Sequence, residues 1–385
     1  MAVLIVFLIV LLCIFVLIYA FDFIAYLKNR YCRFHIGRRS SDAWINTVEN
    51  IAVKWLKHTP TVKITDNSRY VLLDMLTGKY RSNTIQSWQK AALILGLMES
   101  TKKDSITKAR ATAAALLDES GNWKTVPVAV DAGMISYAVL LTADDPHKIK
   151  PAMDKTLEII QANINDAGMI SYTGGCNNAA MYVDTLGLAC PFLALYARIY
   201  GRKELSDIAV HNLRMYHDYG LLPDKALPNH AFDIQTKLPL GVYGWGRGTA
   251  WYVIGLLDTL PELTDDSQKI LITDYLQEAA ESYLSFQHTD GGFGPILQRY
   301  GLYDSSATAV LGWFYYRCYK LFGDIRYKQA ADACLSKLAS VTRFTGAIDW
   351  CQGDTKDIGV FSQTYDIMPF AQGMALRAIY ESKKV

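Results

Sequence analysis

Two aspartates lie where two helices of almost wholly apolar sequence are expected to begin, and such a pair could carry out acid–base chemistry. Asp131 precedes the apolar stretch Ala132–Leu141, and Asp184 lies within Met181–Leu186, where little else is polar. Aspartate commonly caps a helix, so capping is one interpretation of both residues. Two carboxylates that face one cavity can instead differ in pKa, so that one stays protonated near neutral pH and serves as an acid. The sequence alone leaves both interpretations open.

The most specific motif is the sequence GWGRGTAW at Gly244–Trp251. Glycine is used where the backbone turns tightly or approaches a ligand. Arg247 offers a planar fork for a carboxylate, and Trp245 and Trp251 offer faces for stacking. A structural arginine that bridges helix carbonyls is the alternative for Arg247. The motif favours the wall of a site for an anionic ligand with an apolar face.

Three further residues are candidates for substrate binding, and each also has a structural interpretation. His230 lies in the long loop before the glycine-rich motif, Tyr172 lies in a loop rich in glycine, and Ser305 lies at a predicted helix start, where serine often caps. The seven cysteines show no metal-binding or redox spacing. The sequence also lacks a G-x-S-x-G elbow, an HExxH motif, a P-loop and a dinucleotide fingerprint, so we expect neither a metal nor a cofactor.

Two kinds of helical segment alternate along residues 41–385 and must position these side chains. One kind is amphipathic and the other is apolar all round, which is typical of helices inside a large fold. The alternation predicts an all-α, two-layered barrel, an (α/α)6 barrel. The amphipathic segments are Ser41–Lys57, Ile106–Leu117, Lys148–Ile164, Lys203–Tyr219, Ser267–Phe286 and Arg326–Leu338, and the apolar ones are Ile85–Met98, Ala132–Leu141, Tyr182–Tyr196, Thr249–Leu260, Ser306–Tyr319 and Ile367–Tyr380.

The spacing of the apolar segments supports six helical hairpins. They open near Thr84, Asp131, Asp184, Thr249, Ser305 and Asp366, at intervals of 47 to 65 residues. In such a barrel the amino-terminal ends of the inner helices gather at one mouth, where unpaired N–H groups favour an anionic ligand. The heptapeptide DAGMISY occurs at 131–137, where an inner helix opens, and again at 166–172, where we expect a loop.

The amino-terminal segment predicts a membrane anchor over residues 1–28, followed by a basic juxtamembrane linker over 29–40. Val3–Phe21 is a run of 19 apolar residues, long enough to cross a hydrocarbon core of about 30 Å. A cleaved signal peptide fits poorly, because the run is long and no basic residue precedes it. Five basic residues follow it, namely Lys28, Arg30, Arg33, Arg38 and Arg39, which places the soluble body in the cytoplasm of a single-pass protein. The opposite orientation stays open.

Overall composition excludes other classes of protein. The net charge is +2, and 20% of the residues are charged against 51% hydrophobic, so neither a disordered chain nor a nucleic-acid binder is indicated. Residues 41–385 hold 34 basic and 36 acidic residues, so the positive charge belongs to the amino-terminal end.

Several motifs together resemble the unsaturated glucuronyl and unsaturated rhamnogalacturonyl hydrolases of glycoside hydrolase families 88 and 105. The resemblance spans roughly residues 75–380 and implies an (α/α)6 barrel. The motifs that carry it, in the expected order, are Met181–Leu186, Asn229–Asp233, Trp245–Gly248 with Trp251, Ser305–Thr308 and Gln372–Gly373.

The resemblance implies that the protein is an enzyme acting on a 4,5-unsaturated uronic acid at the end of an oligosaccharide. An aspartate, here Asp184, would protonate C4 and help water to add at C5, and Asp131 would contact the sugar and tune Asp184. His230, Trp245 and Arg247 would line the subsite, with no metal or cofactor. Two positions depart from the family pattern, since Val130 replaces the usual histidine and Thr249-Ala250 replaces Asn-Gly.

A membrane-anchored enzyme of this kind suits work beside envelope polysaccharide machinery. Two alternatives come from other functional classes. One is a catalytically idle sugar-binding or scaffold protein, and the other is a different (α/α)6 enzyme, such as an epimerase or an inverting hydrolase.

Overall fold

The computed structural model describes residues 1–34, 37, 41–60, 62–63, 66, 69–78, 80–81, 86–172 and 179–385. The predicted opening at Thr84 and the predicted linker residues Arg38 and Arg39 lie outside the described residues.

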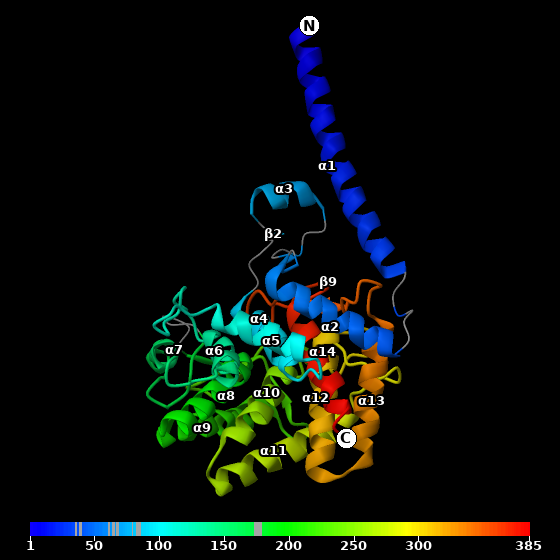
Figure 1. Cartoon of the computed structure of the whole chain (residues 1–385). Helices are drawn as coiled ribbons and strands as arrows, with labels where there is room; N and C mark the ends of the chain where they lie inside the picture. Colours follow the sequence, from blue (N-terminus) through cyan, green and yellow to red (C-terminus); the bar gives the residue numbers. More distant parts are fainter. Residues whose placement is uncertain are drawn as a thin grey trace.

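Within these residues, six inner helices form a closed ring in which each contacts the next, and the last contacts the first (Figure 1). Their strongly apolar sequences explain why they lie inside, since α6 has every residue but Leu141 buried. The inner helices are α4 (Ser87–Met98), α6 (Ala132–Thr142), α8 (Val183–Tyr200), α10 (Gly246–Thr259), α12 (Ser305–Phe322) and α14 (Pro369–Ser382).

Amphipathic helices surround this ring and pack their apolar faces against it, which confirms the predicted (α/α)6 barrel. The observed bounds lie within four residues of the predicted ones at each end. The outer helices are α2 (Ser41–Lys57), α5 (Lys103–Ala114), α7 (Lys150–Ala162), α9 (Lys203–Gly220), α11 (Asp266–Leu284) and α13 (Ile325–Ser340), and a short 3-10 turn, η1 (Leu260–Glu262), follows α10.

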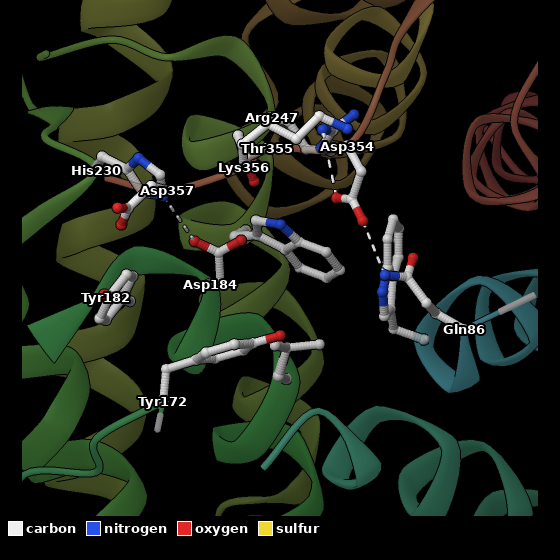
Figure 2. Close-up of a pocket in the computed structure, with 13 residues that line it drawn as sticks. Gln86, Tyr172, Tyr182, Asp184, His230, Arg247, Asp354, Thr355, Lys356 and Asp357 are labelled. Atoms are coloured by element: carbon white, nitrogen blue, oxygen red, sulfur yellow. Dashed lines mark hydrogen bonds and ion pairs between the residues drawn. The ribbon is translucent and has the colours of Figure 1, made fainter. Parts of the chain in front are cut away.

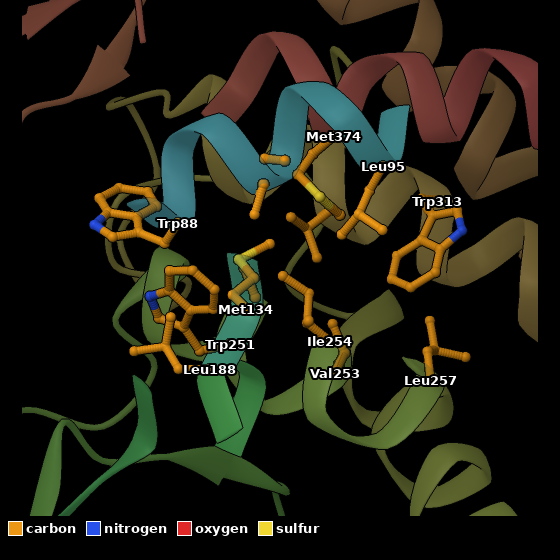
Figure 3. Close-up of a cluster of buried hydrophobic side chains, with 14 of the residues drawn as sticks. Trp88, Leu95, Met134, Leu188, Trp251, Val253, Ile254, Leu257, Trp313 and Met374 are labelled. Atoms are coloured by element: carbon orange, nitrogen blue, oxygen red, sulfur yellow. The ribbon is translucent and has the colours of Figure 1, made fainter. Parts of the chain in front are cut away.

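Glycines let the inner helices approach closely. A Cβ atom on Gly96 of α4 would lie 2.2 Å from the carbonyl oxygen of Gly373 of α14, and one on Gly133 of α6 would lie 2.3 Å from that of Leu188. Buried side chains pack inside the ring, and Figure 3 shows Met134, Leu188, Ile254 and Met374 meeting there.

Short strands shape the loops at the end of the barrel where the inner helices begin. β3 (Ala180–Tyr182) pairs with β6 (Ala231–Asp233), which pairs with β7 (Pro239–Leu240). β8 (Cys351–Gln352) pairs with β9 (Tyr365–Asp366), and we call the segment between them, residues 353–364, the mouth loop. The remaining strands are β1 (Val62–Lys63), β2 (Tyr80–Arg81), β4 (Leu221–Leu222) and β5 (Leu227–Pro228).

The helix α1 (Ala2–Phe34) extends away from the barrel, with the short helix α3 (Val71–Leu76) beside it (Figure 1). α1 is long and apolar enough to cross a membrane. It continues through residues 29–34, the first part of the predicted linker.

Candidate active site

A cavity of about 340 Å³ opens at the end of the barrel where the inner helices begin (Figure 2). Its walls come from the first turns of α4, α8 and α10 and from the mouth loop. The residues that line it are Gln86, Trp88, Tyr172, Tyr182, Asp184, Leu188, His230, Arg247, Trp251, Asp354, Thr355, Lys356 and Asp357.

Asp184 lies in the first turn of α8, and its carboxyl group points into this cavity (Figure 2). The strand pairing of β3 with β6 fixes it there, since the Val183 N–H donates to the carbonyl of His230 at 3.0 Å. Its Oδ2 atom is buried without a hydrogen-bond partner among the described residues. Burial raises the pKa of Asp184 to about 7, although Arg247 opposes the shift. Asp184 can therefore hold a proton near neutral pH and release it within the cavity.

His230 faces Asp184, with its Nε2 atom 3.7 Å from Oδ2. Burial, assisted by Arg247, lowers the pKa of His230 to about 4, so the ring is neutral. Its Nδ1 atom accepts a hydrogen bond from the Gly359 N–H at 3.1 Å. A neutral imidazole carries one proton, so the accepting role of Nδ1 places that proton on Nε2. His230 thus presents an N–H donor toward Asp184 and the cavity.

Arg247 and Trp245 are buried next to the cavity and contact the residues that form its wall. Arg247 is 1% exposed and donates from both terminal nitrogens, to the carbonyls of Gln352 and Gly353, each at 2.7 Å. Arg247 therefore has structural contacts, but with carbonyls of β8 and the mouth loop rather than of a helix, and its charge still borders the cavity. Trp245 is buried outside the lining residues, with its ring centroid 4.6 Å from that of His230.

The mouth loop crosses the cavity and supplies residues that the sequence interpretation missed. Asp354 accepts a hydrogen bond from the Gln86 Nε2 atom at 2.8 Å and lies 4.0 Å from Arg247 (Figure 2). Lys356 and Asp357 follow it along the cavity wall. No motif marks these residues in the sequence, and only the place of the mouth loop before the last inner helix points to the cavity.

Of the other two candidates near Asp184, Tyr172 lines the cavity and Asp131 does not. Asp131 precedes α6 without a side-chain capping bond, lies outside the lining residues, and accepts a hydrogen bond from Ser87 at 3.2 Å. Burial raises the pKa of Asp131 despite that bond. Tyr172 lines the cavity, and burial followed by the charges of Asp131 and Asp184 raises its pKa. The charges of Asp131 and Asp184 therefore both affect the pKa of Tyr172, but of these two aspartates only Asp184 borders the cavity.

Of the last two candidates, Trp251 lines the cavity and Ser305 does not. Trp251 lines the cavity and meets Trp88 edge to face at 5.6 Å between ring centroids. Ser305 is buried at the start of α12, away from the lining residues, and its N–H donates to the Trp350 carbonyl at 3.0 Å. No cluster of three or more histidine, cysteine or acidic side chains suited to a metal occurs in the part of the chain that the structure describes.

Comparison with known proteins identifies relatives by both sequence and fold. Residues 62–385 match the family described as Glycosyl Hydrolase Family 88, which confirms the resemblance seen in the motifs. No curated protein sequence matches the chain significantly.

Three solved structures with the same fold are distant in sequence. A possible member of glycoside hydrolase family 105 from Klebsiella pneumoniae is 13% identical, with a TM-score of 0.73 over 90% of this chain and 94% of its own. An unsaturated glucuronyl hydrolase specific for heparin is 16% identical, with a TM-score of 0.67 over 90% and 99%. The unsaturated glucuronyl hydrolase of Bacillus sp. GL1, responsible for the degradation of glycosaminoglycan, is 17% identical, with a TM-score of 0.61 over 88% and 94%.

Proposed function

The chain belongs to glycosyl hydrolase family 88, and from that premise we propose that it removes a 4,5-unsaturated uronic acid from the end of an oligosaccharide. The observation that carries the proposal is the buried carboxyl of Asp184, whose pKa is raised to about 7 where it borders the cavity. A group that is about half-protonated at neutral pH can both donate and accept a proton.

The reaction begins with protonation of the vinyl ether. Asp184 donates its proton to C4, the C4=C5 electron pair forms the new C–H bond, and the ring oxygen shares the positive charge that develops at C5. The Asp184 carboxylate then accepts a proton from the water that adds to C5, which restores the acid. The resulting hemiketal opens to a ketone at C5 and leaves a hemiacetal at C1. That hemiacetal collapses to an aldehyde, and the glycosidic oxygen takes the hydroxyl proton as the remaining saccharide leaves.

Other lining residues orient the substrate in this scheme. The Nε2–H of His230 donates to the attacking water or to a sugar oxygen next to Asp184. Arg247 and Lys356 supply positive charge for the uronate carboxylate, and Trp251 and Tyr172 present flat faces to the sugar ring.

We further propose that α1 is retained as a membrane anchor. Arg33 of α1 pairs with the fully buried carboxylate of Asp349 at 2.8 Å, and Asn29 accepts a hydrogen bond from Arg343 at 3.0 Å. A leader destined for removal would leave Asp349 without one of its two cationic partners. The basic residues that follow the apolar run favour a cytoplasmic barrel, placed beside envelope polysaccharide machinery. A reporter fused after Val385 that is active only outside the cytoplasm would contradict this orientation.

A substrate comparison tests the proposed reaction. The purified protein is incubated with a lyase-generated unsaturated disaccharide and with its saturated counterpart. We expect the C4=C5 absorbance of the first to disappear and the second to stay intact, because only the vinyl ether can be protonated at C4. Cleavage or epimerisation of the saturated sugar would replace the proposal with conventional hydrolysis or epimerase chemistry.

A further inference from the structure

The carboxyl-terminal end of α1 is fixed to the barrel at the edge of the cavity mouth. The guanidinium of Arg33 donates to both oxygens of Asp349, at 2.8 and 3.0 Å, and to the carbonyl of Tyr365 at 2.8 Å. It also lies 4.5 Å over the ring of Trp350. Although burial raises the pKa of Asp349, the hydrogen bonds from Arg33 and Arg343 lower it overall, so the carboxylate is ionised and held by both. Three directions of contact make this a fixed joint rather than a loose tether.

The contact of Arg33 with Asp349 and Tyr365 lies at the same end of the barrel as the catalytic cavity. Tyr365 lies in β9, whose partner strand β8 follows Trp350, and the mouth loop between these strands lines the cavity. In Figure 1, α1 leaves the barrel at the end marked by β9, while the carboxyl terminus lies toward the other end. The cavity therefore opens on the side from which the apolar helix extends.

The short helix α3 lies beside α1, away from the barrel (Figure 1). The carboxylate of Asp22 in α1 accepts hydrogen bonds from the N–H groups of Tyr70 at 2.7 Å and Val71 at 2.8 Å, so it binds the first residues of α3. The exposed side chains of α3 are apolar, with Leu76 76% exposed, and include Leu73 and Met75. A short helix with an exposed apolar face therefore lies against α1 at Asp22.

Helix lengths place this contact at the membrane boundary. The run Val3–Phe21 is about 28 Å long and fills a hydrocarbon core of about 30 Å. Asp22 then lies near the end of the core, and the 12 residues that follow it, up to Phe34, add about 18 Å before the barrel begins. Exposed Lys28 and Arg30 lie in that interval, where anionic headgroups attract basic residues. Beyond Asp22 the apolar surface continues along α1, where Phe23, Ile24 and Leu27 are exposed, and α3 lies beside it at this level.

A hydrogen-bonded link joins the α3 segment to the cavity. Asp66, which precedes α3, accepts hydrogen bonds from the Ser362 hydroxyl at 2.5 Å and the Thr364 hydroxyl at 3.3 Å, both in the mouth loop. The same loop is held across the cavity by Gln86 and by His230. α3 is thus connected to the loop that covers the catalytic residues.

We propose that α3 inserts into the headgroup layer of the membrane and that the catalytic mouth opens toward that membrane. The inference rests on the proposed retention of α1 as an anchor. The fixed joint at Arg33 and the contact at α3 give two attachments, which prevent the barrel from turning its mouth to bulk solution. The glycans within reach of Asp184 are then those attached to, or lying on, the membrane surface.

Photo-crosslinking to lipid tests the orientation. p-Benzoylphenylalanine replaces Leu76 in the full-length protein, reconstituted in nanodiscs of phosphatidylethanolamine and phosphatidylglycerol that carry an alkyne-tagged lipid. Phe15, in the apolar span, is the position that reports the anchor alone. Leu321, which is 43% exposed at the far end of α12, is the matched apolar control on the opposite end of the barrel.

We expect lipid adducts at positions 15 and 76, at least tenfold above those at position 321. Adducts at 15 without adducts at 76 would overturn the membrane-facing mouth and leave the anchor intact. Absence of adducts at 15 would refute the anchor, and with it this inference. A crosslink from 76 to a second copy of the chain would show that α3 is a protein interface, which also overturns the proposal.

Discussion

Asp184 differs from an ordinary surface aspartate in its state of protonation at neutral pH. Its carboxyl is buried at the start of α8, and burial raises its pKa from 3.8 to about 7, with Arg247 opposing the shift. His230, whose pKa burial lowers to about 4, stays neutral over the same range. The proposed reaction needs an acid and a neutral donor side by side, and the two opposite shifts supply them.

The pH dependence of the reaction follows from these values. The acid form of Asp184 is present below pH 7 and is lost as the pH rises through its pKa of about 7. We therefore expect kcat/KM on an unsaturated disaccharide to fall about tenfold per pH unit on the alkaline side of that value. A profile measured from acid to alkaline pH checks this. A rate that stays level through pH 9 would show that protonated Asp184 is not required.

The same burial predicts how an isosteric substitution changes stability. Between pH 3.8 and about 7 the folded state keeps a proton that the unfolded state has released, so wild-type stability decreases as the pH rises through this window. Asp184→Asn removes the ionisable group. We expect its Tm to exceed that of the wild type at pH 8 and to equal it near pH 3.5. A Tm difference that does not change with pH would contradict the raised pKa.

The two helix layers were predictable from the sequence, because the inner helices are apolar all round and the outer helices are amphipathic. Charge-free stretches must be buried and amphipathic stretches must cover them, so two helix types in alternation specify two layers. The two copies of DAGMISY illustrate the limit of local sequence. The copy at 131–137 opens α6, whereas the copy at 166–172 follows α7 in a loop, because the tertiary surroundings differ.

The candidate site was only partly predictable. Asp184, His230, Arg247, Trp251 and Tyr172 line the cavity, and the sequence places them at helix starts or in the preceding loops. The mouth loop could not be derived, because the contact of Asp354 with Gln86 joins residues 268 positions apart in the chain. The hydrophobic pattern sets the register of helices, whereas such loop contacts depend on side-chain geometry.

The joint between α1 and the barrel gives a prediction at the element scale. Arg33→Met removes one of two cationic partners from the buried carboxylate of Asp349. We expect the free energy of unfolding of the full-length protein in nanodiscs to fall by about 1–3 kcal/mol. Arg30→Met, an exposed change in the same helix, is the control and should have little effect. Equal effects of the two substitutions would show that the joint contributes nothing.

For the whole molecule, a mouth that faces the membrane predicts a preference for tethered substrate. Leu76→Asp adds a charge to the exposed side chain of α3 and should weaken its insertion. We expect turnover of an unsaturated disaccharide coupled to a phospholipid to fall several-fold in vesicles, with turnover of the free disaccharide unchanged. Leu321→Asp is the matched control. A parallel loss on both substrates would contradict an orienting role for α3.

The central claim is that Asp184 catalyses hydration of an unsaturated uronyl group, and one comparison tests it most directly. Wild type and Asp184→Asn are incubated with the same lyase-generated unsaturated disaccharide while the C4=C5 absorbance, sugar binding and Tm are followed. The account predicts that the wild type removes the absorbance, and that the variant binds the sugar and stays folded but loses at least about 100-fold in rate. Equal turnover by both proteins, or binding without turnover by the wild type, would contradict it.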